Sequence, residues 1–139
     1  ESMVLHEIGE AKAGELLGEA WGEMALAASA TRAEIAMRAV RDLLADCLST
    51  LPALLERGNA AALHFHFATF DALRRQLFPQ ALEAYEDYAR SGTADRLRQV
   101  VREGRERWLD SARGLLALTP AQREAALEAL LPPPAPRAS

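Results

Sequence analysis

The sequence predicts an all-α protein, and three features of its composition lead to that prediction. Alanine and leucine, both strong helix formers, account for 29 and 22 of the 139 residues. Valine, isoleucine and threonine, which strands favour, number only 4, 2 and 5. No proline occurs before Pro52, so none interrupts a helix in the first part of the chain. We therefore expect an antiparallel bundle of four long helices followed by a short C-terminal helix.

The first two helices are expected on either side of Ser29-Ala30. Apolar residues fall at helical spacing from Val4 to Met24. Thr31 then begins a capping box, in which its hydroxyl accepts a backbone N–H and Glu34 reaches back. A single unbroken helix over residues 2–51 is the alternative. Pro52 predicts a kink or stop at 49–51, and the chain continues in an apolar pattern to a glycine at 58.

The remaining three helices follow from their caps and prolines. Asn59 offers an N-cap for a third helix that ends at residues 90–92, with a bend near Phe78 because Pro79 follows. The fourth helix is expected to start at Thr93. The fifth begins with Thr119-Pro120-Ala121-Gln122, a capping box, and runs to Leu131. Residues 1–131 are thus predicted to form one domain, and the proline-rich residues 132–139 an extended or disordered tail.

Charge and composition exclude several classes of function. The net charge is −4, which argues against nucleic-acid binding. No apolar run approaches the roughly 20 residues of a membrane-spanning helix. The single cysteine, Cys47, forms no internal disulfide, which favours a reducing compartment. The preference for arginine over lysine is typical of GC-rich coding. We expect a cytoplasmic bacterial protein.

No catalytic or metal-binding motif is evident. His64 and His66 lie two apart and point in nearly opposite directions on a helix, so they cannot share one ion. His6 is the only other histidine, and Cys47 lies on an apolar helix face where a small hydrophobic residue is usual. We predict that the protein is not an enzyme and carries no metal or cofactor.

The glycines of the first helix predict a surface for close helix packing. Gly14, Gly18 and Gly22 lie four apart, and three interior glycines cost helix stability of up to ~1 kcal/mol each. Such a ridge lets another helix backbone approach closely. Beside it lie the like-charged Glu15, Glu19 and Glu23.

A basic stripe on the fourth helix offers a partner for these glutamates. Arg98, Arg102 and Arg105 lie at i, i+4 and i+7. Opposite charge favours adjacency of the first and fourth helices, within one chain or between two copies. Two separately solvated faces are the alternative.

Aromatic residues concentrate in the third helix and predict a possible apolar pocket. Its lining would consist of Phe67, Phe70, Phe78, Tyr85 and Trp108. Ordinary core filling is the alternative. Phe65 lies off this face and would need a second neighbour, either the fifth helix or another subunit.

Three resemblances accompany these patterns. Leu118-Thr119-Pro120-Ala121-Gln122 resembles the Leu-Thr-x-x-Gln signature of small helical periplasmic stress chaperones of the Spy type. The long alanine-rich helices are similar to those of phasins, the coat proteins of polyester granules. The aromatic bundle is similar to the ligand-binding half of TetR-type repressors.

These observations favour a non-enzymatic interaction or oligomerisation domain of a bacterial regulatory or signalling protein. Its expected partner is a protein, most simply a second copy in a homodimer. The alternative is a TetR-like sensor domain that binds an apolar small molecule in the aromatic pocket. A phasin-like or Spy-like surface-binding protein is a more remote alternative.

Overall fold

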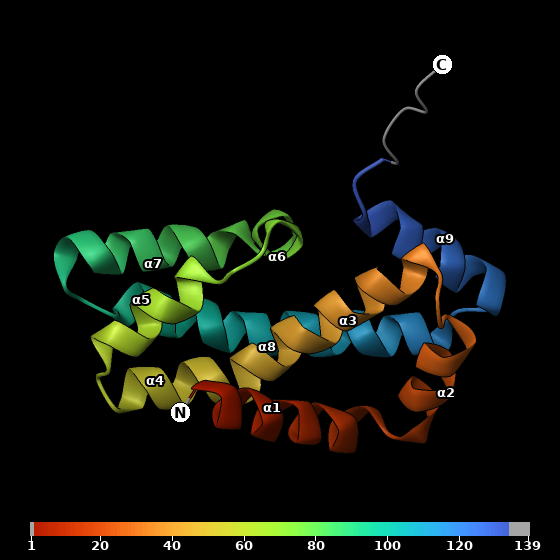
Figure 1. Cartoon of the computed structure of the whole chain (residues 1–139), viewed down its shortest axis with the longest axis horizontal. Helices are drawn as coiled ribbons and strands as arrows, with labels where there is room; N and C mark the ends of the chain where they lie inside the picture. Colours follow the sequence, from red (N-terminus) through yellow and green to blue (C-terminus); the bar gives the residue numbers. More distant parts are fainter. Residues whose placement is uncertain (1, 134–139) are drawn as a thin grey trace.

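A computed structural model describes residues 2–133 of the chain, and the side chains of residues 4–133 (Figure 1). All regular structure in this part is helical, which confirms the all-α prediction. None of its helices is long and apolar enough to cross a membrane. The elements are α1 (Ser2–Leu17), α2 (Glu19–Ala27), α3 (Arg32–Ala45), a π-helical turn η1 (Asp46–Thr50), α4 (Leu51–Glu56), α5 (Ala60–Ala68), α6 (Ala72–Leu77), α7 (Pro79–Ser91), α8 (Asp95–Ala117) and α9 (Pro120–Leu130).

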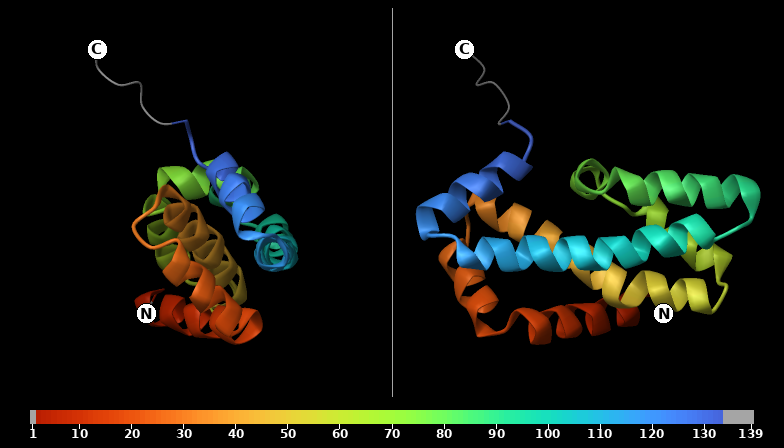
Figure 2. Two further views of the ribbon diagram at one scale, coloured as in Figure 1. Left: turned by 90° about the vertical axis from the view of Figure 1, so that its right-hand side faces the viewer. Right: turned by 180° about the vertical axis from the view of Figure 1, so that it is seen from behind.

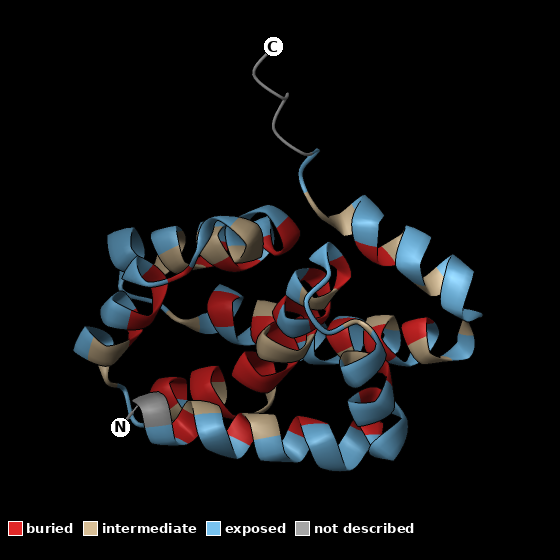
Figure 3. Cartoon of the chain, turned by 45° about the vertical axis from the view of Figure 1, so that its right-hand side comes forward, coloured by how far each residue is buried: buried red, intermediate tan, exposed pale blue. Residues whose placement is uncertain are grey.

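Helix α8 lies along one side of the molecule, as the end-on view shows, and contacts most of the other helices (Figure 2). It contacts α3, α7 and η1 along its length and α9 near its end (Figures 1 and 2). Helix α1 lies against η1 and α3 on the other side. Buried residues gather on the faces that these helices turn toward one another (Figure 3). The apolar core is therefore shared between the two halves of the chain.

The segment predicted as the third helix forms three separate helices, α5, α6 and α7. The predicted arrangement of four long helices is therefore wrong. Helix α5 ends at Ala68, and α6 begins after Asp71, whose side chain accepts a hydrogen bond from the backbone N–H of Arg74 at 2.9 Å. Phe78 separates α6 from α7 where a bend was expected. Phe70 and Phe78 are both buried, so the chain leaves its helical path where these rings enter the core.

The predicted glycine ridge is wrong as a feature of one helix. Gly18 has φ 73°, a left-handed conformation that separates α1 from α2. A Cβ added at Gly14, Gly18 or Gly22 would meet nothing within 4 Å, so none of the described helices packs closely there. Close contacts occur instead at Gly9 and Gly104. A Cβ on Gly9 would lie 2.5 Å from the Ala45 carbonyl oxygen, and one on Gly104 would lie 2.7 Å from the Phe78 ring.

Local capping signals are confirmed in part. Residues 28–31 separate α2 from α3, so the alternative of one unbroken helix is wrong. The Thr31 hydroxyl makes no capping bond and donates to the Ala28 carbonyl oxygen. Glu34 reaches back but accepts from the Ala30 N–H, one residue before the N-cap, so the predicted capping box does not form. The Thr119–Gln122 capping box is complete. Asn59 caps α5, and the left-handed Gly92 ends α7.

The kink predicted at Pro52 takes the form of the π-helical turn η1. Proline lacks a backbone N–H and crowds the carbonyl one turn earlier, and a widened turn relieves both effects. The helical path continues from α3 through η1 into α4, and Asp46 becomes buried at the start of η1. Of the predicted tail, residues 134–139 lie outside the described residues.

Candidate functional site

A close approach between α1 and the junction of α3 with η1 creates the most polar buried region of the described chain. It occurs where Gly9 lies against the Ala45 backbone. His6 and Glu10 are one turn apart on α1, on either side of Gly9. Asp42 and Asp46 are one turn apart on either side of Ala45. The glycine therefore allows two pairs of ionisable side chains to meet.

Asp46 is the centre of this cluster, with 1% of the residue exposed. One carboxylate oxygen, Oδ1, lies 3.4 Å from Nδ1 of His6. The other, Oδ2, accepts a hydrogen bond from Nη1 of Arg74 on α6 at 3.1 Å. Nε2 of His66 on α5 is 3.7 Å from the same oxygen. A single buried carboxylate thus connects α1, η1, α5 and α6.

A surface hollow of about 360 Å³ opens beside Asp46. Two buried polar atoms that lack any hydrogen-bond partner belong to its lining residues, namely Oγ1 of Thr50 and Nε2 of His66. An unpaired buried polar group typically costs about 1–3 kcal/mol of stability. The full lining is His6, Glu7, Glu10, Asp46, Thr50, Phe65, His66, Thr69 and Arg74.

The surroundings shift the pKa of three groups in the cluster. The hydrogen bond with Asp46 raises the pKa of His6, although partial burial opposes this effect. Burial lowers the pKa of His66, and the nearby Asp46 charge only partly offsets it. Burial also raises the pKa of Asp42, whereas the charge of Arg41 acts in the opposite direction. The pKa values of the two imidazoles beside Asp46 are therefore shifted in opposite directions.

The hollow is rich in hydrogen-bond acceptors. Three carboxylates line it, from Glu7, Glu10 and Asp46, together with the hydroxyl of Thr50. The lowered pKa of His66 keeps its ring neutral, which leaves one ring nitrogen able to accept. Its single arginine, Arg74, already pairs with Asp46 and Asp71. This lining suits a positively charged ligand that donates hydrogen bonds.

A second group of ligating atoms lies at the edge of the hollow. Nε2 of His6 is 3.3 Å from Oε1 of Glu10 and 4.0 Å from Oδ1 of Asp42. Within the described residues, these three side chains form a group whose geometry could hold a metal ion. Nη2 of Arg41 lies 3.3 Å and 3.5 Å from the same Glu10 and Asp42 oxygens. A resident guanidinium therefore neutralises these carboxylates.

This site was not predicted from the sequence. His6 and Glu10, and likewise Asp42 and Asp46, have the four-residue spacing of neighbours on a helix. This spacing was the only available signal, because nothing local shows that the two pairs face each other. His64 and His66 do separate as expected. His64 is exposed and bonds to the Tyr85 hydroxyl, whereas His66 is buried beside Asp46.

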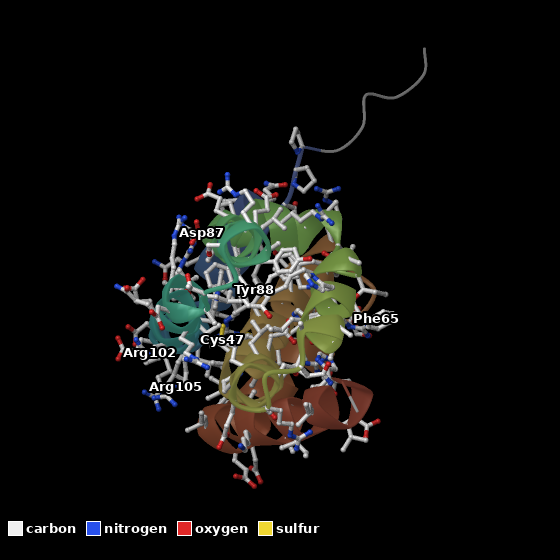
Figure 4. All side chains as sticks on the ribbon, turned by 90° about the vertical axis from the view of Figure 1, so that its left-hand side faces the viewer. Cys47, Phe65, Asp87, Tyr88, Arg102 and Arg105 are labelled. Atoms are coloured by element: carbon white, nitrogen blue, oxygen red, sulfur yellow. The ribbon has the colours of Figure 1, made fainter. Side chains whose placement is uncertain are left out.

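The five aromatic residues predicted to line a pocket contribute to the core, and none of them lines the hollow beside Asp46. Phe67 stacks on Tyr85, with ring centroids 4.5 Å apart. Phe78 packs edge-on against Trp108 at 5.8 Å. Phe65, in contrast, is 61% exposed, lies at the hollow and projects outward, away from the core (Figure 4).

The predicted acidic and basic surfaces do not meet within this chain. Glu15, Glu19 and Glu23 are exposed, and none of them makes an ion pair in the described structure. Arg102 and Arg105 project from α8 on the side opposite to Phe65 (Figure 4). Arg98 donates to the Leu55 carbonyl oxygen at 3.3 Å. The expected adjacency of the two surfaces therefore does not occur within one chain.

Comparison with known proteins gives one match. The family model described as "Family of unknown function (DUF6866) C-terminal domain" matches residues 1–132. No curated protein and no solved structure matches the chain.

Proposed function

The chain belongs to the DUF6866 C-terminal domain family, and we propose that this domain is a non-enzymatic binding module for a small cationic ligand. The observation that carries the proposal is the acceptor-rich hollow beside Asp46, with the unpaired Thr50 Oγ1 and His66 Nε2. A purely structural core would gain stability by replacing such groups with apolar ones.

The ligand class follows from the lining of the hollow. Carboxylates of Glu7 and Glu10 lie near its edge, with the partly exposed ring of Phe65 beside them. Carboxylates and an aromatic face together recognise organic ammonium groups. Its volume of about 360 Å³ lies at the lower end of the range typical of small-molecule sites. We therefore assign the hollow to a small aliphatic amine or guanidine. The apolar ligand expected from the aromatic residues is less well supported, because those five side chains pack in the core and none of them lines this hollow.

The test measures thermal unfolding of the chain with putrescine, agmatine or choline as probes. A ligand that binds only the folded state at one hundred times its Kd adds about 2.7 kcal/mol of stability. Thr50→Val keeps the side-chain shape, so it should stabilise the free protein and abolish the stabilisation by the probe. If no probe stabilises the wild-type chain, the proposal is wrong.

A matched pair of glutamates on α1 provides the control. Both Glu7 and Glu15 are exposed, but only Glu7 lines the hollow. Glu7→Gln should weaken binding of the probe, and Glu15→Gln should leave it unchanged. Equal effects of the two substitutions would show that the probe binds through general charge attraction.

We also propose a second function, self-association, which the unpaired charged surfaces favour. The acidic residues at 15, 19 and 23 and the basic Arg102 and Arg105 are complementary and do not meet within one chain. A second copy can bring them together. Sedimentation should then show dimers that dissociate at high salt, because salt screens exposed charge. Arg102→Glu should weaken them, and a monomer at all concentrations would contradict this proposal.

A further inference from the structure

We propose that His6, Glu10 and Asp42 form a binding site for a divalent transition-metal ion such as Zn²⁺ or Ni²⁺. This inference rests on the proposed cation-binding function and names the cation that the edge of the hollow selects. The three side chains offer one nitrogen and two carboxylate oxygens, and these atoms lie within 4.8 Å of one another. Imidazole combined with carboxylate is a donor set that suits zinc and nickel.

The distances agree with a shared ion. Ligand atoms about 2.1 Å from a tetrahedral metal lie about 3.4 Å from one another. Nε2 of His6 and Oε1 of Glu10 are 3.3 Å apart, which matches this value. Oδ1 of Asp42 is 4.0 Å from Nε2, about 0.6 Å beyond this value.

Asp46 positions the imidazole for this role. Its Oδ1 lies 3.4 Å from Nδ1 of His6, and its side chain is 2% exposed. When Nδ1 carries the proton and its N–H donates a hydrogen bond to Asp46, the lone pair of Nε2 points toward Glu10 and Asp42. Metal-binding histidines commonly have such a carboxylate behind them. Asp46 is therefore a positioning residue, and it is held in place by Arg74.

The positive charge of Arg41 lies beside the carboxylates that would bind the metal ion. Its Nη2 contacts the same two carboxylate oxygens that would bind the ion, at 3.3 Å and 3.5 Å. The Arg41 side chain is 34% exposed and its buried Nε has no hydrogen-bond partner, so the guanidinium is held by its ion pairs with Glu10 and Asp42. Metal binding would then release a guanidinium to solvent. The structure thus assigns Arg41 as an internal competitor of the metal.

The buried atoms next to this group are the independent sign of a ligand. Charged clusters at protein surfaces are common without any bound ion. Here His6 and Glu10 also line the hollow, together with His66 and Thr50, whose buried Nε2 and Oγ1 have no hydrogen-bond partner. His66 is 8% exposed and Thr50 1% exposed, so bulk water does not satisfy them. Unpaired buried polar atoms beside the ligating side chains therefore support a bound ligand in this region.

Isothermal titration of the metal-free chain with Zn²⁺ and with Ni²⁺ tests the inference. Asp42→Asn and His6→Gln should each weaken binding at least tenfold, and Asp46→Asn should weaken it 10-fold to 100-fold. Arg41→Gln should tighten binding several-fold, a gain that misfolding cannot produce. Glu15→Gln is the control and should change nothing. Unchanged affinity in Asp42→Asn, or weaker binding in Arg41→Gln, would overturn the inference.

The same variants separate this inference from the proposed function. Asp42 does not line the hollow, and Thr50 is not among the proposed metal ligands. Asp42→Asn should lose metal and keep amine binding, whereas Thr50→Val should do the reverse. Amine binding without metal binding would refute the metal site alone. Absence of both would refute the metal site and the proposed function together.

Discussion

Gly9 and Gly14 lie in the same helix, and the structure predicts opposite outcomes for their replacement by alanine. A Cβ at Gly9 would lie 2.5 Å from the Ala45 carbonyl oxygen, whereas contacts normally begin at 3.4 Å. Helix α1 would therefore have to move away by about 0.9 Å. The contact is with backbone, which cannot rotate aside as a side chain can. A Cβ at Gly14 would meet nothing within 4 Å.

The magnitudes follow from two opposing effects. Alanine is favoured over glycine inside a helix by about 1 kcal/mol. Overpacking a close contact costs typically about 1–3 kcal/mol. We expect Gly14→Ala to raise the free energy of unfolding by up to ~1 kcal/mol. Gly9→Ala should lower it by up to about 2 kcal/mol, because the clash exceeds the gain in helix propensity.

Urea unfolding followed by circular dichroism measures both values, and the shared helix makes Gly14→Ala the matched control. The propensity gain is common to both variants, so the difference between them should equal the overpacking cost of about 1–3 kcal/mol. If both substitutions stabilise the protein equally, α1 does not lie against Ala45. The apposition of His6 and Glu10 with Asp42 and Asp46 would then be refuted as well.

Two further predictions concern backbone conformation and pH. Gly18→Ala should destabilise the chain by about 1 kcal/mol, because φ is 73° at this position. Gly22→Ala, inside α2, should not destabilise it. If urea unfolding shows that Gly18→Ala stabilises the chain, α1 and α2 form one continuous helix. His66 has a lowered pKa, so below pH ~6.5 the unfolded chain binds a proton that the folded chain rejects. Wild-type stability should therefore fall relative to His66→Gln as the pH drops from 6.5, by at most ~1.4 kcal/mol per pH unit, with His64→Gln as the exposed control. Parallel pH profiles of wild type and His66→Gln in urea unfolding would contradict this assignment.

The helical class and several helix ends could be predicted from the sequence because they depend on interactions within a few residues. Asn59 caps α5 through the N–H three residues later, and Thr119 and Gln122 complete their capping box across a single turn. The left-handed Gly92 ends α7 through a bond to Tyr88. Each of these signals lies in a segment short enough to be interpreted without knowledge of the remaining chain.

The partners of the functional side chains were decided only by the tertiary structure. His6 and Asp46 are 40 positions apart, and their contact depends on Gly9 meeting Ala45. The four-residue spacing of Gly14, Gly18 and Gly22 predicted close packing at these glycines, but the close contact is at Gly9. Spacing alone does not show which face of a helix another helix covers. The burial of Asp46 depends on a π-helical turn and on Arg74 from α6. Such long-range contacts form only when the whole chain packs, because the free energy of burying one helix face depends on the face opposite to it.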